Sequence, residues 1–142
     1  MKLIIDTNII FSGLIKKSIT REILLNPEFD FYIPEFYNIE FKKYKSYIFE
    51  KFEGKEKELE RLIEIIHEKI IIVMEEEYHD KMEEADTFIG KFDPKDIPFI
   101  VLALSIENDG VWTKDKHFIE KKDINIFSTE DIISIYKKKL NQ

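Results

Sequence analysis

The sequence predicts a three-layer α/β/α sandwich with a mainly parallel central sheet of about five strands. Two observations predict this class. Short apolar runs alternate with helical patterns along the whole chain, and the runs are continuously apolar instead of alternating apolar with polar residues. Strands of that kind are buried on both faces, as in a parallel sheet covered by helices. The 142 residues suit one domain, so we expect a single domain over residues 1–142.

The expected strands are short apolar runs bounded by turn or helix signals. They cover residues 3–5, 29–33, 70–74, 110–113 and 124–127. Ser18 is placed to cap a short helix that Asn26 and Pro27 end. Pro34 is expected in the first turn of a long helix that runs towards residue 50.

Two apolar stripes predict further helices with one face towards the core. Their members are Leu59, Leu62, Ile63 and Ile66, then Tyr78, Met82, Ala85 and Ile89 before Gly90. Asp93 is a good N-cap and Pro94 suits the first helical position, which predicts a buried helix through residues 97–106. Residues 108–110, Asn-Asp-Gly, are typical of a turn into the next strand.

Composition excludes several classes of site. The chain has no cysteine, so a disulfide scaffold, a thiol nucleophile and a cysteine-bound metal are excluded. A metal would be held by oxygen atoms or by histidine, and hard cations are the default. No apolar stretch approaches the roughly 20 residues that span a bilayer. We therefore expect a soluble cytoplasmic protein with no membrane segment.

The net charge of −7 by itself argues against a nucleic-acid partner, because phosphate affinity comes mainly from lysine and arginine. The positive charges are not spread evenly, however. Lysines gather near the candidate acids described next, at positions 16–17, 42–45 and 114–116. These groups are either solvated helix faces or a surface for phosphates.

Four acidic residues are candidates for one site. Asp6 directly follows the first strand and Asp115 follows the fourth, so both are expected at the carboxyl edge of the sheet, where such folds bind ligands. Asp96 lies near a helix N-terminus. Glu40 lies about two turns into its helix, within reach of the same edge. Taken singly, each residue also has a structural explanation as a cap or a solvated acid.

Four carboxylates at one place repel each other unless a cation joins them. Magnesium prefers oxygen ligands and usually takes one or two carboxylates directly, with water and substrate phosphate completing its shell. Such a site hydrolyses phosphodiesters. Glu35 and Asp93 are competing acids, but Glu35 is explained by the first turn of its helix and Asp93 by capping, so we favour Glu40 and Asp96.

The chain resembles the PIN domain nucleases, including the VapC-type toxins, over essentially its whole length. The resemblance rests on four segments in order. They are Ile4-Ile5-Asp6-Thr7-Asn8-Ile9, Glu40-Phe41-Lys42-Lys43-Tyr44, residues 96–104 beginning Asp96-Ile97-Pro98, and Trp112-Thr113-Lys114-Asp115-Lys116-His117-Phe118.

The resemblance implies an endoribonuclease dependent on Mg²⁺ or Mn²⁺, with Asp6, Glu40, Asp96 and Asp115 as its acidic quartet. Asp6, Asp96 and Asp115 are expected to bind the metal, and Glu40 to help orient the attacking water. The other implied residues are Asn8 and Thr113, which would support the acids, and Lys42, Lys43, Lys114 and Lys116, which would hold the RNA backbone. An antitoxin protein and a homodimer are implied by the resemblance alone.

Other functions remain open at this point. The alternatives are a housekeeping RNA-processing nuclease and a non-catalytic RNA-binding module that keeps the fold without turnover. A phosphoacceptor receiver-like domain also places acids beyond parallel strands, but it leaves Glu40 and Asp115 without a role. His117 is close enough in sequence to Asp115 to suggest a contact with substrate phosphate.

Overall fold

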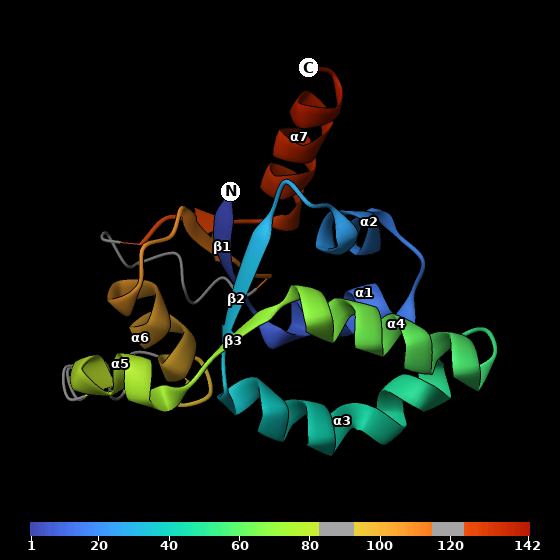
Figure 1. Ribbon diagram of the computed structural model, residues 1–142, viewed down its shortest axis with the longest axis horizontal. Coiled ribbons are helices and arrows are strands. Elements are labelled where there is room, and N and C mark those ends of the chain that lie inside the picture. The colour runs from blue at the N-terminus through green and yellow to red at the C-terminus, as the bar shows by residue number, and fades with distance from the viewer. Residues whose placement is uncertain (83–92, 115–123) are drawn as a thin grey trace.

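The computed structural model describes residues 1–82, 93–114 and 124–142. These contain a five-stranded sheet between two layers of helices (Figure 1). The strands are β1 (Lys2–Ile5), β2 (Asp30–Pro34), β3 (Ile71–Val73), β4 (Gly110–Trp112) and β5 (Ile126–Phe127). Their order is β3-β2-β1-β4-β5 and every neighbouring pair is parallel, which confirms the predicted fold class.

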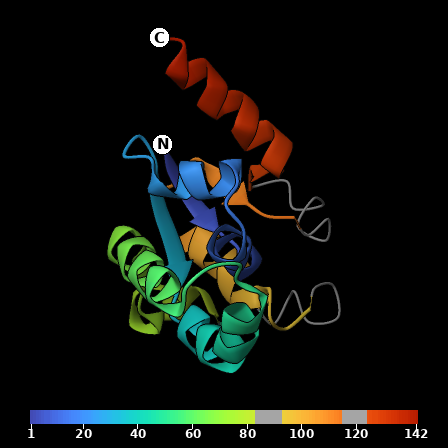
Figure 2. The ribbon, with the colours of Figure 1, turned by 90° about the vertical axis from the view of Figure 1, so that its right-hand side faces the viewer.

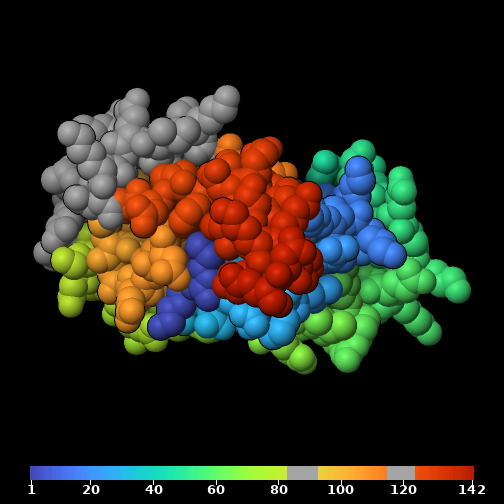
Figure 3. Space-filling model, turned by 90° about the horizontal axis from the view of Figure 1, so that it is seen from above, coloured from blue at the N-terminus to red at the C-terminus, as the bar shows by residue number. Residues whose placement is uncertain are grey.

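The helices that the structure describes are α1 (Thr7–Ile15), α2 (Ile19–Leu25), α3 (Phe36–Lys51), α4 (Glu56–Lys69), α5 (Glu75–Met82), α6 (Ile97–Ser105) and α7 (Thr129–Leu140). Helices α5 and α6 lie on one face of the sheet, where α6 packs on β1 and β2 (Figure 1). Helices α1, α2 and α4 lie on the other face, with α3 packed against α1. Helix α7 contacts α2 and projects beyond the sheet at the end where both termini lie (Figure 2). Seen from above, its red atoms lie beside the blue atoms of the N-terminal part of the chain (Figure 3). No helix in these ranges is long and apolar enough to cross a membrane.

The core explains why the apolar runs became central strands. Leu3, Ile4 and Ile5 of β1 are all fully buried, because strands pair with β1 on both edges and helices cover both faces. The rings of Phe31 on β2 and Trp112 on β4 face each other with centroids 6.0 Å apart. Burial of such large side chains is the main stabilising contribution to a core of this kind.

Pro34 is not in the first turn of α3, which corrects the expectation from the sequence. It is the last residue of β2, where it is paired with Val73 of β3. The next residue, Glu35, donates its backbone N–H to the carbonyl oxygen of Val73 at 2.9 Å. This sheet contact keeps the backbone extended through Pro34, so α3 begins at Phe36.

Helix α6 also begins later than the pattern at Asp93 and Pro94 predicts. Residues 94–96 form a turn, and Asp96 is the N-cap of a helix that starts at Ile97. The Asp93 carboxylate accepts the backbone N–H of Lys95 at 3.0 Å, which is the turn that aspartate side chains commonly stabilise. Asp93 therefore caps a turn and not the helix. The second half of the stripe at residues 85–90 lies outside the described residues.

The strand order indicates where a ligand-binding crevice lies. The chain runs from β1 outward to β2 and β3 on one side, and then crosses to β4 and β5 on the other side of β1, so the strand order reverses between β1 and β4. Crevices in open α/β sheets form at such a reversal, beyond the carboxyl ends of the strands. Asp6 follows β1 and Thr113 follows β4, so both side chains start at this point.

Gly110 is a position where we expect alanine to be strongly destabilising. Its φ is +151°, and an added Cβ would lie 2.7 Å from the backbone oxygen of Asn125. Gly54 has a similar φ of +146°, but a Cβ there approaches only side chains, at 3.0 Å or more. We expect Gly110→Ala to lower the free energy of unfolding by at least about 2 kcal/mol, through strain and the blocked approach of β5.

Urea denaturation of Gly110→Ala and Gly54→Ala measures this difference. The two variants share the cost of the positive φ, so only the contact with the β5 segment separates them. Equal destabilisation of both would show that the close approach at Gly110 is unimportant.

Candidate functional site

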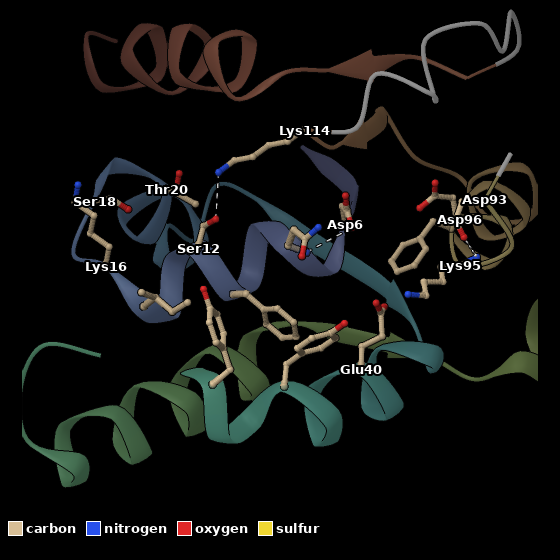
Figure 4. Close-up of a pocket in the computed structure, with 16 residues that line it drawn as sticks. Asp6, Ser12, Lys16, Ser18, Thr20, Glu40, Asp93, Lys95, Asp96 and Lys114 are labelled. Atoms are coloured by element: carbon tan, nitrogen blue, oxygen red, sulfur yellow. Dashed lines mark hydrogen bonds between the residues drawn. The ribbon is translucent and has the colours of Figure 1, made fainter. Parts of the chain in front are cut away.

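A cleft of about 890 Å³ lies at the carboxyl edge of the sheet. Asp6, Glu40 and Asp96 all line it, and they come from the start of α1, the second turn of α3 and the start of α6 (Figure 4). These three predicted residues are 34 and 56 positions apart along the chain. The fold brings them to one surface. Acids that served only as helix caps or as solvated side chains would not need to lie together.

Asp6 is fixed at the centre of this edge. Its backbone N–H donates to the carbonyl oxygen of Trp112 at 3.1 Å, continuing the pairing of β1 with β4. As the N-cap of α1, its Oδ1 accepts the backbone N–H of Asn8 at 3.4 Å. Its Oδ2 accepts the hydroxyl of Thr113, from the end of β4, at 2.9 Å. The carboxylate is therefore held on both sides, and the Asn8 contact comes from the backbone.

Glu40 is held by a residue that the sequence analysis did not select. The hydroxyl of Thr7 donates to Glu40 Oε1 at 2.7 Å, a short hydrogen bond to a carboxylate. Thr7 is only 1% exposed, so its side chain has a single fixed environment. The bond joins the first turn of α1 to α3, and it aims Glu40 at the cleft.

The surroundings of Glu40 raise its pKa above the ordinary value. Burial is the largest cause, the hydrogen bond from Thr7 acts in the opposite direction, and the negative charge of Asp6 raises the pKa further. Lys95 and Lys43 lower it by smaller amounts. Figure 4 shows the Lys95 side chain directed towards Glu40 from the turn before α6. A carboxylate made costly in this way favours a nearby cation.

Asp96 and Asp93 both line the cleft, but their surroundings differ. The Oδ2 atom of Asp96 is buried. Asp93 is exposed and its Oδ1 accepts the N–H of Lys95. The other competing acid, Glu35, accepts the backbone N–H of Glu75 at 2.7 Å and lines a separate hollow beside α5.

The predicted lysines are placed unequally. Lys114 lines the cleft and its ammonium donates to the Ser12 hydroxyl of α1 at 3.1 Å. Lys43 acts electrostatically on Glu40, while Lys42 is exposed on α3 away from the lining residues. Lys16, which was noted only as part of a charged pair, also lines the cleft.

Three predictions lie outside the described residues. They concern Asp115, the fourth acid of the proposed quartet, together with Lys116 and His117. Thr113 and Lys114 directly precede this segment, and both face the site through their bonds to Asp6 and Ser12.

The donor set suits a hard divalent cation. Within residues 1–82, 93–114 and 124–142, no group of three or more Asp, Glu or His side chains is arranged to hold an ion by itself. Magnesium needs only one or two direct carboxylates, with waters filling the remaining positions. Asp6 and Asp96 can supply these, and the negative charge of Asp6 already contributes to the raised pKa of Glu40 beside it, after burial.

The residues missed by the sequence analysis gave weak signals. Thr7 is a polar residue followed by the apolar positions Ile9 and Ile10 of a buried helix, which hints at a polar contact inside the protein. Nothing in the sequence pairs it with Glu40, 33 positions away. Lys95 was not selected either, although it directly precedes Asp96 in the sequence.

We expect Glu40→Gln to raise the free energy of unfolding in metal-free buffer at neutral pH. The folded-state pKa of Glu40 lies above its ordinary value of 4.5, so the charged form weakens the fold wherever pH exceeds that raised pKa. As pH falls through the raised pKa towards 4.5, wild-type Glu40 takes up its proton and the penalty disappears. Glutamine keeps an oxygen that accepts from Thr7 and carries no charge.

Urea denaturation in EDTA at pH 7.5 and at about pH 4 measures the effect. The stabilisation should be present at the higher pH and absent at the lower one. Glu50→Gln changes an exposed acid on the same helix and should alter neither value by much. A Glu40→Gln variant less stable than wild type at pH 7.5 would contradict the electrostatic description.

Comparison with known proteins adds two findings. A family model described as PIN domain matches residues 4–133. Among solved structures, a chain of VapBC2 from Rickettsia felis, in a crystal structure of VapBC2 bound to a DNA fragment from their promoter, superposes with a TM-score of 0.61. It is 16% identical, and the match covers 90% of this chain and 98% of that one. No curated protein sequence gives a significant match.

Proposed function

Because the chain belongs to the PIN domain family, a family of nucleases that generally use divalent metal ions, we propose that it is a metal-dependent endoribonuclease. The observation that carries the proposal is the meeting of Asp6, Glu40 and Asp96 in one cleft at the reversal point of the sheet. Asp115 completes the proposed acidic set. The resemblance to a solved VapBC2 chain supports the same fold for such a site.

In the proposed mechanism, Asp6, Asp96 and Asp115 hold Mg²⁺ or Mn²⁺ and Glu40 orients the attacking water. When bound there, such a metal would supply an activated water and would stabilise the leaving oxygen of the phosphodiester. Asp6 can act as a metal ligand without moving, because hydrogen bonds from the Asn8 backbone N–H and the Thr113 hydroxyl already fix its two oxygens. The hydrogen bond from Thr7 holds the Glu40 carboxylate in one orientation, which the role of positioning a water requires.

Positive side chains near the acids are proposed to bind the RNA backbone. Lys114 and Lys43 flank the cleft, and Lys42 and Lys116 are proposed to extend this surface. The net charge of −7 repels RNA, so binding depends on these few lysines. Their contacts with phosphates should weaken steeply as the salt concentration rises.

The test is cleavage of a panel of structured and single-stranded RNAs with Mg²⁺, Mn²⁺ or EDTA. Cleavage that needs a divalent ion and stops in EDTA supports the proposal. RNA binding without cleavage under any metal would instead favour a non-catalytic RNA-binding module.

We further propose that this ribonuclease is a VapC-type toxin that acts in the cytoplasm as a homodimer and is neutralised by an antitoxin. The similarity to a VapBC2 chain supports an antitoxin partner. Growth arrest on expression, relieved by co-expressing a small protein encoded beside the gene, would support this role. Growth unaffected by expression of an active nuclease would favour housekeeping RNA processing, and size-exclusion chromatography with light scattering tests the dimer.

A further inference from the structure

The cleft extends well beyond its acidic part. Glu40 and Asp96 lie at one end, while Lys16, Ser18 and Thr20 lie at the other (Figure 4). The acidic side chains suggest a function for the first end of the cleft but none for the second. The volume of about 890 Å³ is near the upper end of the range for small-ligand sites, so it leaves room for more than a metal ion and one phosphate.

Two tyrosines line the cleft beyond Glu40, four and seven positions after it on α3. Tyr44 and Tyr47 are three positions apart on α3, so they share one face of the helix. Tyr44 is 36% exposed and Tyr47 is 50% exposed, although both have large apolar rings. Phe11 of α1 packs against Tyr44, with ring centroids 5.8 Å apart. Packing of the core does not explain why rings are presented here.

A lysine ammonium lies over each of the two tyrosine rings. The Lys43 ammonium lies 5.3 Å from the centroid of Tyr44, and the Lys51 ammonium lies 5.7 Å from that of Tyr47. Such contacts contribute little at exposed sites, so the lysines can leave the rings for a phosphate. Aromatic faces with cations close by are the combination that binds single-stranded nucleic acid.

Lys114 connects the two ends. Its ammonium reaches Ser12, halfway along α1, between Asp6 and the lysine and hydroxyl groups beyond it (Figure 4). Ser12, Ser18 and Thr20 also line the cleft, and hydroxyl groups of this kind suit the 2′-hydroxyls of RNA.

We propose that Tyr44 and Tyr47 form a subsite that stacks an unpaired base of the RNA, next to the phosphodiester that is cut. This inference rests on the proposed ribonuclease function. Bases inside an A-form duplex are stacked on each other and present no free face to a ring in a cleft wall. The subsite therefore selects single-stranded RNA, or a loop, over a duplex.

The test measures RNA binding separately from cleavage. Asp6→Asn provides the background, so that the RNA stays intact, and the probe is a short single-stranded oligoribonucleotide carrying the fluorescent base 2-aminopurine. Tyr44→Leu with Tyr47→Leu removes both rings and keeps good helix formers. Tyr44→Phe with Tyr47→Phe keeps the rings. Ile39→Ala, at a 64% exposed position of α3 outside this cleft, is the control.

We expect the leucine pair to weaken single-strand binding at least about tenfold and to abolish quenching of the probe by stacking. The phenylalanine pair and Ile39→Ala should stay within about twofold of the parent, and a blunt duplex of the same sequence should bind the parent poorly. Unchanged binding by the leucine pair, or equal binding of duplex and single strand, overturns the subsite alone. If the parent binds no RNA and the wild type cleaves none, the proposed function falls as well.

Discussion

Asp6→Asn is expected to reduce RNA cleavage by more than about 100-fold while leaving the fold intact. Substitution of residues that only support metal ligands costs about 10- to 100-fold, so loss of a ligand charge should cost more. The fold should survive because asparagine is as good an N-cap as aspartate, and its amide oxygen can accept the Asn8 N–H. The Thr113 hydroxyl can rotate to accept from the new amide group. Initial cleavage rates in Mg²⁺, with thermal denaturation beside them, measure both effects.

Asp93→Asn is the matched control for this substitution. It makes the same chemical change on the same cleft, but Asp93 caps a turn through an oxygen that asparagine also provides. We expect cleavage within about threefold of wild type. Equal losses in both variants would show that the general charge of the cleft matters and that Asp6 has no special role. Full activity in Asp6→Asn would contradict the proposed site.

The sheet could be predicted because each strand is a continuously apolar run that is recognisable from its own residues. Each expected run overlaps an observed strand, from Lys2–Ile5 to Ile126–Phe127. A strand buried on both faces must be apolar at consecutive positions, so burial is recorded directly in the sequence. The short helix α2 was also predictable, since Ser18 accepts the N–H of Arg21 as its cap.

Helix starts were predicted less well, because contacts between distant segments decide them. Pro34 is compatible with either a helix start or a strand end, and pairing with Val73 of β3 decides for the strand. At α6, the local pattern of Asp93 and Pro94 fits a helix start equally well as a turn. The turn forms, and Asp96 becomes the N-cap.

The candidate site was predictable only as far as its acids. Asp6 stands directly after a buried strand, and the parallel sheet dictates where its side chain begins. The support for Glu40 was not predictable, because the bond from Thr7 depends on how α3 packs on α1. The tyrosine end of the cleft depends on the same packing, since Tyr44 on α3 rests on Phe11 of α1.

Thr7→Val is expected to lower the cleavage rate by about 10- to 100-fold, the usual cost of losing a partner that orients a functional carboxylate. Valine fits the space of this 1% exposed side chain but cannot donate to Glu40 Oε1. The hydroxyl lowers the pKa of Glu40, so its loss should raise that pKa further. If Glu40 accepts a proton during cleavage, the acid side of the pH–rate profile must then move to higher pH.

Thr7→Ser separates this role from packing, because serine keeps the hydroxyl and loses only a methyl group. We expect serine to retain most of the activity and the wild-type pH profile, at a modest loss of thermal stability from the small cavity left by the methyl group. Valine should show the reverse, with a shifted profile in a well-folded protein. A slower valine variant whose pH profile is unchanged would mean that Thr7 only supports the local fold. Since the bond from Thr7 is what ties Glu40 to the helix that begins at Asp6, the pH profile tests whether the two acids work as one site.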